Sequence, residues 1–487
     1  MAQKDELTKI IGKKNVLDDQ KTLDAYSRDE SFVIPVRPSC VVKPTKNTEV
    51  QALIKWANET GTPLVPVSSG APHYRGDTIP ATGGAVVVDL SKMNKIIRVD
   101  RRNRVAMIEP GVTFGEFIAA LDKEGLAAHM PLVPRSTKSV VGSYLEREPI
   151  TMPRHHWDPQ DPLLCMEVIF GDGHLFMTGS AAGPGTLAQQ WENKRAQIRP
   201  MGPAQTDFQR VVQGSQGTMG IVTWLSVKCR VKPELKKSFL VPAKKVEDLL
   251  GLVQKMQKVL LGDDCLILNS HNLACIMAKD SSEVATLKDA LPPYVLFISA
   301  EGRGVSPEDK VAYQVNDIKI AAQANGLIPL EALPCGLSAD DVAAALAKPS
   351  DEPYWKNKAK GACRDIFFLT TIDRTPKFVK AMFDQAESKG FSPNDIGVYL
   401  QPTVNGTSCH VEFNLNCDSN NKAEMAKVKG LVNDSLVFAN MGAFFSRPYG
   451  SWSDMVYRRD GETATFLKKV KTIFDPNKIM NPGKLCF

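Results

Sequence analysis

The stretch Pro66-Val-Ser-Ser-Gly-Ala-Pro-His73-Tyr-Arg-Gly76 begins inside a short apolar run at residues 63–67. Such a run predicts a strand, and the four small residues after it predict a tight turn. Consecutive backbone N–H groups in a turn of this kind form a nest that binds an anion, and small side chains let a phosphate approach. We therefore interpret this turn as phosphate-binding, with an ordinary Gly/Ser turn as the alternative.

Two further segments are rich in glycine or in turn residues. Gly214-Ser-Gln-Gly217-Thr-Met-Gly220 precedes a predicted strand at residues 221–231, whereas the Rossmann fingerprint opens a helix. The P-loop pattern GxxxxGK[ST] is also missing, so both common nucleotide-binding motifs are excluded. The last segment, Phe474-Asp-Pro-Asn-Lys-Ile-Met-Asn481-Pro-Gly-Lys484, has turn residues that predict an ordered tail held at a specific place.

The chain divides into four zones. Residues 1–36 are predicted to be a polar helical lead. Alternating strand and helix patterns then run to residue 233. Residues 234–439 combine long helical patterns with strand candidates at 294–301, 365–371, 396–401 and 410–415, which indicates an α+β domain on an antiparallel sheet. Within it, residues 334–360 have the composition of a surface excursion. Residues 440–487 hold a helix and the tail, which we expect to return to the first domain.

Composition restricts the class of protein. The chain has 487 residues, 43% hydrophobic and 23% charged, with a net charge of +6, which is typical of a globular protein with two or three domains. No basic stretch is interleaved with aromatic residues, so nucleic acid is not an expected partner. No apolar run approaches the roughly 18 residues of a membrane span, and no secretion signal opens the chain. We expect a cytoplasmic protein, with ten scattered cysteines as reduced thiols.

Several segments, in one order along the chain, resemble the FAD-dependent oxidoreductases of the vanillyl-alcohol oxidase and p-cresol methylhydroxylase (PCMH) family. They are Ala85-Val-Val-Val-Asp-Leu-Ser-Lys-Met-Asn, Ile108-Glu-Pro-Gly-Val-Thr-Phe114, Ser139-Val-Val-Gly-Ser143-Tyr-Leu-Glu-Arg147 and Met166-Glu-Val-Ile-Phe-Gly-Asp-Gly173. The C-terminal Asn481-Pro-Gly-Lys484 is similar to the tail of the glycolate oxidase-like members. The resemblance implies an α+β chain with a PCMH-type two-subdomain FAD-binding domain at residues 37–233, completed by residues 440–487, and an antiparallel-sheet α+β cap domain at residues 234–439.

The resemblance also implies FAD as the cofactor. Relatives of the berberine-bridge type attach their flavin through a histidine in the first turn, and here that place is taken by Pro72. The alternative attachment regions are His73 and Cys409-His410, and we expect non-covalent FAD. The residues implied to contact the cofactor are Ser68, Ser69, Gly70, Ala71, Pro72, His73, Pro134, Ser139, Gly142, Ser143, Gly217, Ile221, Asn481 and Lys484.

On the substrate side the chain departs from the family pattern. Phenol-oxidising members place an acid before a His-Trp pair, where this chain has His155 followed by His156. They also use a Tyr-Arg pair for the phenolate, where this chain has Ser446-Arg447. If residues 155 and 156 lie on a strand, one of the two imidazoles faces the flavin and suits a general base. We predict these two histidines and Arg447 as catalytic residues.

A metal site is not predicted, because the metal-binding motif of the hydroxy-acid branch is absent from residues 405–414. Two other cations are candidate anion ligands. Lys138 suits a phosphate of the cofactor, with exposure to solvent as the alternative, and Arg154 suits a substrate carboxylate.

The predicted function is an FAD-dependent oxidoreductase that takes a hydride from an alcohol or a benzylic or phenolic-type carbon, as a dehydrogenase rather than an oxidase. A dehydrogenase of 2-hydroxy acids similar to glycolate or D-lactate is one alternative. A non-catalytic FAD electron-transfer subunit is another. The expected partners are an anionic or aromatic small molecule and a redox protein (a flavoprotein, a cytochrome or an iron–sulfur subunit), in a homo- or hetero-oligomer.

Overall fold

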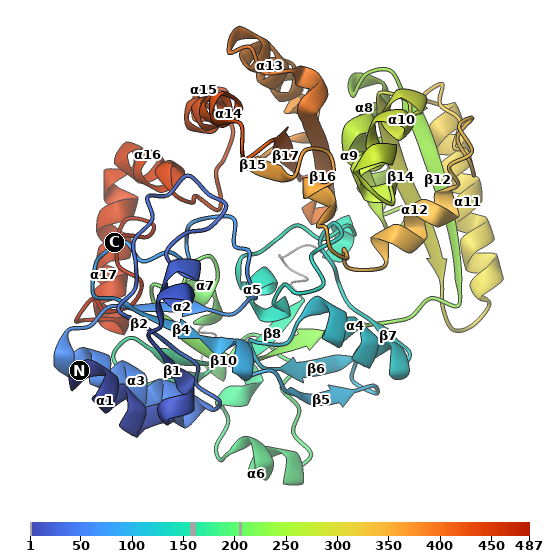
Figure 1. Cartoon of the computed structure of the whole chain (residues 1–487). Helices are drawn as coiled ribbons and strands as arrows, with labels where there is room; N and C mark the ends of the chain where they lie inside the picture. Colours follow the sequence, from blue (N-terminus) through green and yellow to red (C-terminus); the bar gives the residue numbers. More distant parts are fainter. Residues whose placement is uncertain (1, 156–161, 204–206) are drawn as a thin grey trace.

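The computed structural model describes residues 2–155, 162–203 and 207–487. Figure 1 shows a lower part built on two sheets and an upper part built on a third, larger sheet. All strands of the third sheet come from residues 235–417, between segments that form the lower part. How far the two parts behave as separate domains stays a prediction.

The first sheet has the strand order β1-β2-β4-β3. Its strands are β1 (Val16–Leu17), β2 (Cys40–Val42), β3 (Leu64–Val67) and β4 (Val86–Asp89). β2, β4 and β3 are parallel, and the helix α3 (Asn47–Thr60) makes the crossover from β2 to β3. α3 ends at Gly61, whose φ of 68° favours glycine. The apolar face of α3 is fully buried, which stabilises the position of β3 and of the turn that follows it.

The second sheet is antiparallel, in the order β5-β6-β10-β8-β9. Its strands are β5 (Ile96–Asp100), β6 (Val105–Ile108), β8 (Leu163–Phe170), β9 (Leu175–Met177) and β10 (Gly220–Lys228). The helices α4 (Phe114–Lys123) and α5 (Val140–Leu145) pack on it, and β7 (Leu126–Ala127) pairs with β11 (Arg230–Val231) beside it. α4 begins at a capping box of Thr113 and Glu116, a pattern that is readable in the sequence.

The third sheet is antiparallel, in the order β12-β14-β13-β16-β17-β15. Its strands are β12 (Leu235–Ala243), β13 (Cys265–Asn269), β14 (Tyr294–Gly302), β15 (Ala362–Thr370), β16 (Ile396–Thr403) and β17 (Ser408–Cys417). One face carries a large apolar core under α8 (Glu247–Lys258), α11 (Pro307–Gln323), α13 (Thr375–Ser388) and α14 (Lys422–Asp434). The other face packs against α9 (Ser270–Met277) and α12 (Ala339–Leu346) at one end, and its remaining part faces a cavity.

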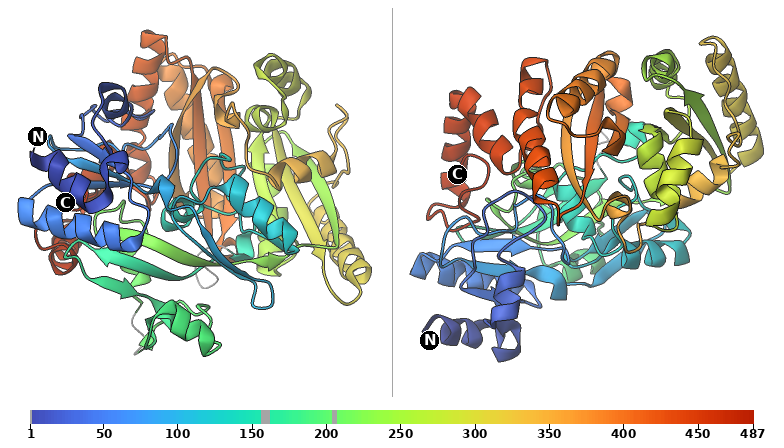
Figure 2. Two further views of the ribbon diagram at one scale, coloured as in Figure 1. Left: turned by 60° about the horizontal axis from the view of Figure 1, so that its bottom comes forward. Right: turned by 45° about the horizontal axis from the view of Figure 1, so that its top comes forward.

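The C-terminal segment returns to the lower part of the molecule. After α16 (Ser451–Arg459) and α17 (Gly461–Phe474), the tail lies beside β3: Leu64 pairs with Met480 in a parallel bridge, and the N–H of Asn481 donates to the carbonyl of Leu64 at 2.8 Å. Figure 2 shows this segment next to the N-terminal part in two further views.

Two expectations from the sequence need correction. The N-terminal lead is not wholly helical, because β1 follows α1 (Ala2–Ile11) and pairs with β2 as an edge strand. Residues 334–360 are not simply a surface excursion. Trp355 is 1% exposed and donates from its indole Nε1 to the carbonyl of Val133 at 3.0 Å. The sequence did not indicate that Trp355 is buried, because a single tryptophan without periodic apolar neighbours predicts neither a strand nor a helix.

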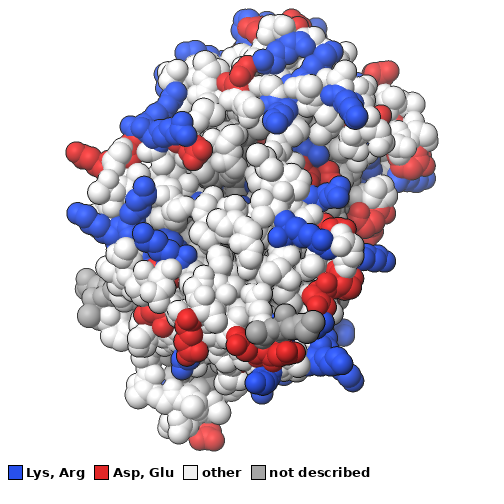
Figure 3. Space-filling model, turned by 60° about the vertical axis from the view of Figure 1, so that its left-hand side comes forward, with Lys and Arg blue, Asp and Glu red and all other residues white. Residues whose placement is uncertain are grey.

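The surface carries charges of both signs. On the face in Figure 3, basic and acidic side chains are interspersed around a central area without charge, rather than gathered in one basic stripe. Among the described residues, no helix is both long and apolar enough to cross a membrane.

Candidate active site

A cavity of about 220 Å³ lies where the two parts of the molecule meet. Its walls come from the turn after β3, from the loop before α5, from the start of β10, from the third sheet and from the segment after α15 (Val437–Asn440). Of the site residues predicted from the sequence, nine line it: Ser68, Ser69, His73, Pro134, Lys138, Gly142, Gly217, Ile221 and Arg447.

The turn after β3 faces this cavity through its two serines. Ser69 Oγ accepts a hydrogen bond from the backbone N–H of Ser139 at 3.0 Å, which joins the turn to the start of α5. Gly142 lies so close that a Cβ there would stand 3.0 Å from Ser68 Oγ. The backbone N–H groups of Ser69, Gly70 and Ala71 donate no hydrogen bond to a residue that the structure describes. Gly70, Ala71 and Pro72 do not line the cavity themselves.

Two predicted serines hold the framework rather than the cavity surface. Ser139 is fully buried, donates to the carbonyl of Pro110 at 2.6 Å and accepts from the N–H of Gly142 as the N-cap of α5. Ser143 Oγ donates to Glu148 Oε2 at 2.6 Å. Both serines therefore position neighbouring groups of the wall.

Gly217 closes the opposite wall. Its φ is 72°, and a Cβ there would stand 2.4 Å from Pro66 Cγ, so a side chain would push β3 away. Ile221 follows on β10, as predicted for a strand after the glycine segment.

The two predicted tail residues act on the backbone of the walls. Asn481 Nδ2 donates to the carbonyls of Asp77 (2.9 Å) and Gln216 (2.7 Å), and Lys484 Nζ donates to the carbonyl of Gly76 at 2.7 Å. The tail thus ties the β3 turn to the glycine segment before β10, and neither side chain lines the cavity.

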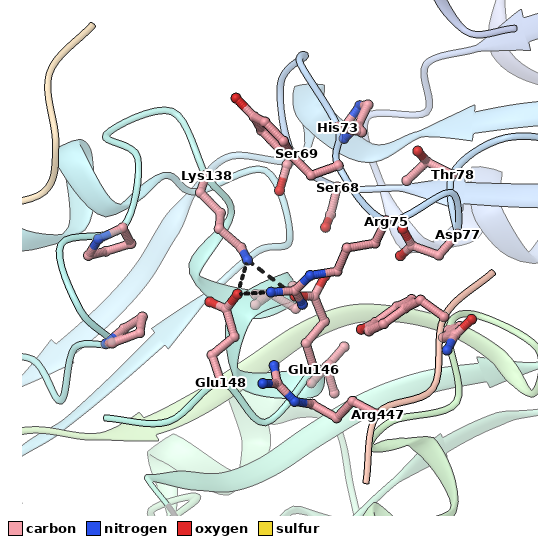
Figure 4. A pocket seen from close by; sticks show the side chains of 18 of the residues that line it. Ser68, Ser69, His73, Arg75, Asp77, Thr78, Lys138, Glu146, Glu148 and Arg447 are labelled. Atoms are coloured by element: carbon pink, nitrogen blue, oxygen red, sulfur yellow. Dashed lines mark hydrogen bonds and ion pairs between the residues drawn. The ribbon is translucent and has the colours of Figure 1, made fainter. Parts of the chain in front are cut away.

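In the middle of the cavity, two carboxylates bind two cations (Figure 4). Arg75 pairs with Glu146 at 2.6 Å and with Glu148 at 2.8 Å, and Lys138 pairs with the same carboxylates at 3.1 and 2.6 Å. Burial alone would raise the pKa of Glu148, but Lys138 and Arg75 outweigh it and hold that pKa well below its usual range. Lys138 therefore points into the cavity rather than to solvent. Its ammonium group pairs with Glu146 and Glu148 and not, as one prediction had it, with a phosphate of the cofactor.

Arg447 points toward this cluster from the other side (Figure 4). It is 5% exposed, its Cζ lies 4.5 Å from the ring centre of Phe367, and its Nη1 has no hydrogen-bond partner in the described part of the chain. It forms no ion pair with a residue that the structure describes. Burial, together with the positive charge of Arg75, lowers the pKa of Arg447 from its ordinary value. A buried guanidinium without a counter-ion is costly, and it suits an anionic ligand.

Arg135 is a second cation of the wall without a carboxylate partner among the described residues. Its guanidinium lies over the ring of Tyr74 at 5.2 Å, beside the β3 turn, and no described residue forms a hydrogen bond with its Nη1. Burial and the charge of Arg135 lower the pKa of His73 to about 4, so this imidazole is neutral at pH 7.

The third sheet contributes a polar stripe to the cavity. Lys356 Nζ lies 2.8 Å from Asp365 on β15 and 2.5 Å from Glu412 on β17. Glu412 also lies 3.1 Å from His410 Nε2, and Tyr399 completes this wall. Burial opposes the charge of Lys356, but the two carboxylates raise its pKa well above the ordinary value. His410 is fully buried behind Glu412 and does not line the cavity, and burial lowers its pKa.

The remaining sequence predictions have different outcomes. His155 lies in a 3₁₀ helix (Pro153–His155) rather than on a strand, so the premise of the strand-alternation argument is not met at this residue. Its side chain and all of His156 lie outside the described residues, and their role as a base stays a prediction. Arg154 donates to the carbonyls of Leu260 and Gly262, in the loop between α8 and β13, and does not line the cavity.

Some cavity residues were missed, although signals for them exist. His410-Val-Glu412-Phe-Asn414 alternates polar and apolar residues with the period of a strand, which marks a polar face. Tyr449 lines the cavity two positions after Arg447, so a tyrosine does accompany this arginine after all. No signal marked Arg75, whose partners lie about 70 positions away.

The residues present fit a dinucleotide such as FAD. The turn of small residues after β3 has backbone N–H groups that donate to no described residue, and Arg135 adds a buried cation beside that turn. Among the described residues, no group of three or more His, Cys, Asp or Glu side chains is placed to hold a metal ion.

Comparisons with known proteins agree with this fit. A family model for an FAD binding domain matches residues 38–179, and a model for the C-terminal domain of FAD linked oxidases matches residues 452–485. The chain is similar to the glycolate oxidase subunit GlcD of Bacillus subtilis, with 24% identity over 99% of this chain and 96% of that protein. It is 28% identical to the flavoprotein subunit of 4-cresol dehydrogenase (hydroxylating) of Pseudomonas putida over 51% of this chain and 46% of that subunit.

Among solved structures, p-cresol methylhydroxylase with substrate bound superposes with a TM-score of 0.84 at 19% identity, over 100% of this chain and 96% of that chain. The predicted PCMH-type α+β fold is confirmed. The predicted FAD cofactor is confirmed as well.

Proposed function

We propose that this chain, an FAD-linked oxidoreductase, removes a hydride from an alcohol or benzylic-type carbon of a substrate that carries an anionic group. The observation that supports this proposal is Arg447, a buried cation without a carboxylate partner among the described residues, which points into the cavity. The aromatic rings of Tyr354, Tyr399 and Tyr449 line the same cavity, and they suit an aromatic substrate.

The chain's own residues bind and orient in this proposal. The β3 turn and the loop before α5 hold the cofactor, and Arg447 orients the substrate through its anionic group. Bound FAD supplies the hydride acceptor. We assign Arg135 to the cofactor rather than to the substrate, because it lies over Tyr74 at the cofactor turn.

We further propose that FAD is held without a covalent bond. Pro72 offers no nucleophile, and His410 lies behind Glu412, off the cavity wall. His73 does line the cavity, and it is the side chain that would carry the bond if the flavin were attached covalently. Acid precipitation of the holoprotein should leave the yellow colour in the supernatant; flavin retained in the pellet, and lost from the pellet of His73→Ala, would contradict the proposal.

Oxidation of 2-hydroxy acids is the second candidate function. The similarity to a glycolate oxidase subunit extends over almost the whole chain, whereas the similarity to the cresol enzyme covers about half. A 2-hydroxy acid also offers a carboxylate to Arg447. As the electron acceptor we propose a partner protein rather than O₂, with the chain acting as a dehydrogenase.

An anaerobic reduction screen tests these proposals. The yellow protein is mixed with aromatic alcohols, alkylphenols and 2-hydroxy acids, with and without a carboxylate, and bleaching of the flavin is followed. We expect an anionic member to reduce the flavin, and Arg447→Met to raise its KM about 10- to 100-fold, as expected for a lost charged hydrogen bond.

The matched control is Arg458→Met, because Arg458 is an exposed arginine on α16. Reduction by dithionite but by no substrate would favour a non-catalytic electron-transfer subunit. Reoxidation of the reduced flavin by air within one turnover would contradict the dehydrogenase assignment.

A further inference from the structure

The charges around Arg447 are unevenly matched. Three cations point into the middle of the cavity, Arg75, Lys138 and Arg447, against the two carboxylates Glu146 and Glu148 (Figure 4). Both carboxylates pair with Arg75 and Lys138, whereas Arg447 forms no ion pair of its own with a residue that the structure describes. The cluster therefore has a net charge of +1.

Further charges of both signs lie around this cluster. Asp77 lies near it, and Lys484 faces both Asp77 and a second carboxylate, Asp29. Arg135 lies at the cofactor turn, over Tyr74. The next charges along the wall are Lys356 with Asp365 and Glu412, a group with a net charge of −1.

We propose that Glu146 and Glu148 are specificity-determining residues that restrict this site to substrates with a single negative charge. They cancel Arg75 and Lys138 and leave Arg447 to bind one anionic group. A second anionic group would meet either a saturated cation or the net negative group on the third sheet, and like charges at short range are strongly disfavoured in a desolvated site. The inference rests on the proposed role of Arg447 as the substrate anchor.

Arg75, which pairs with both carboxylates, also contacts aromatic rings of the cavity wall. The Cζ of Arg75 lies 5.2 Å from the ring centres of both Phe367 on β15 and Tyr449. Arg447 lies over the same Phe367 ring, so the two guanidinium groups occupy neighbouring places. Loss of one carboxylate would therefore free a second positive charge beside Arg447, where a dianion could use it.

The test uses two non-reacting probes, benzoate with one charge and isophthalate with two, titrated into the holoprotein while the flavin absorbance spectrum is recorded. We expect the wild type to bind benzoate at least tenfold more tightly than isophthalate. In Glu148→Gln this ratio should fall at least tenfold, because isophthalate gains affinity. Glu146→Gln should act in the same direction.

Two further variants separate charge from structure. Lys138→Met combined with Glu148→Gln removes one charge of each sign and should restore the wild-type ratio. Glu424→Gln also removes a carboxylate that pairs with a lysine, Lys360 at 2.9 Å, but it lies outside the cavity and should leave the ratio unchanged.

The outcomes are distinct. An unchanged ratio in both single variants, or a double variant that behaves like Glu148→Gln, would overturn the charge proposal. If benzoate fails to bind the wild type, both this proposal and the role of Arg447 are wrong. If the probes discriminate as expected but no substrate reduces the flavin, the proposed function fails and the charge selection stands.

Discussion

Among the single residues of the cavity wall, Asp77 has a carboxyl group whose pKa is clearly raised. Burial and the nearby charge of Glu146 raise its pKa to about 6. A raised carboxyl pKa means that the folded chain binds a proton more tightly than the unfolded chain does. The contribution to stability is therefore full at low pH and is lost as the pH rises through about 6.

Asp77→Asn should remove this dependence. Between about pH 4 and 6 the free energy of unfolding of the flavin-free wild type should fall by up to about 3 kcal/mol relative to the variant. Urea unfolding at several pH values measures this difference. Asp289→Asn, an exposed position on α10 (Ser281–Ala290), should keep the wild-type slope, and a parallel pH profile for Asp77→Asn would show that this carboxyl does not titrate as described.

At the scale of the element, the C-terminal tail builds part of the cavity without lining it. Asn481 has a φ of 38° and spans two wall segments with one amide group. Its hydrogen bonds fix the turn after β3 against the glycine segment before β10. The tail is therefore a structural brace for the cofactor site, even though it is separated from the β3 turn by about 400 positions.

Asn481→Gly keeps the positive φ accessible and removes both hydrogen bonds. We expect a loss of about 1–3 kcal/mol in the free energy of unfolding and weaker binding of FAD, measured by titration of the flavin-free protein. Asn405→Gly is the matched control, because Asn405 also has a positive φ (53°) but lies exposed in the short 3₁₀ segment Val404–Gly406. Equal FAD affinities in the two variants would exclude the brace.

At the scale of the whole molecule, a buried ion cluster joins the two parts. The Glu301 side chain on β14 is fully buried, lies 2.5 Å from Arg230 on β11, and also contacts Arg303 and Lys236. β11 belongs to the lower part and β14 to the upper part. Glu301 thus neutralises cations from both sides of the junction.

Glu301→Gln should remove the ion pair of the partly buried Arg230 and lower the free energy of unfolding by about 3–5 kcal/mol. Loss of the junction should also separate the flavin and tryptophan unfolding curves, which we expect to coincide in the wild type. Glu331→Gln breaks an exposed pair with Lys237 and should resemble the wild type. Coincident curves for Glu301→Gln would show that the cluster does not couple the two parts.

Local sequence determined much of the architecture and one wall of the site. The apolar run before Ser68 and the glycines around Gly217 predict a strand, a turn and a second strand from propensity alone, because those residues restrict their own backbone. The resemblance to the PCMH family added the cofactor and the order of domains. Both depend on patterns of neighbouring residues, which a single sequence contains.

The tertiary structure alone decided which charges meet. Arg75, Glu148 and Arg447 come from three distant segments, and nothing in their local sequence states that two are paired and the third is not. From the sequence, Lys138 suits either a phosphate or exposure to solvent. In the folded chain it forms ion pairs with two carboxylates. Ion pairing depends on distance and burial, and in this cavity both are set by the contact between the third sheet and the turn after β3. The sequence alone therefore does not show which charged side chains on the substrate side are paired.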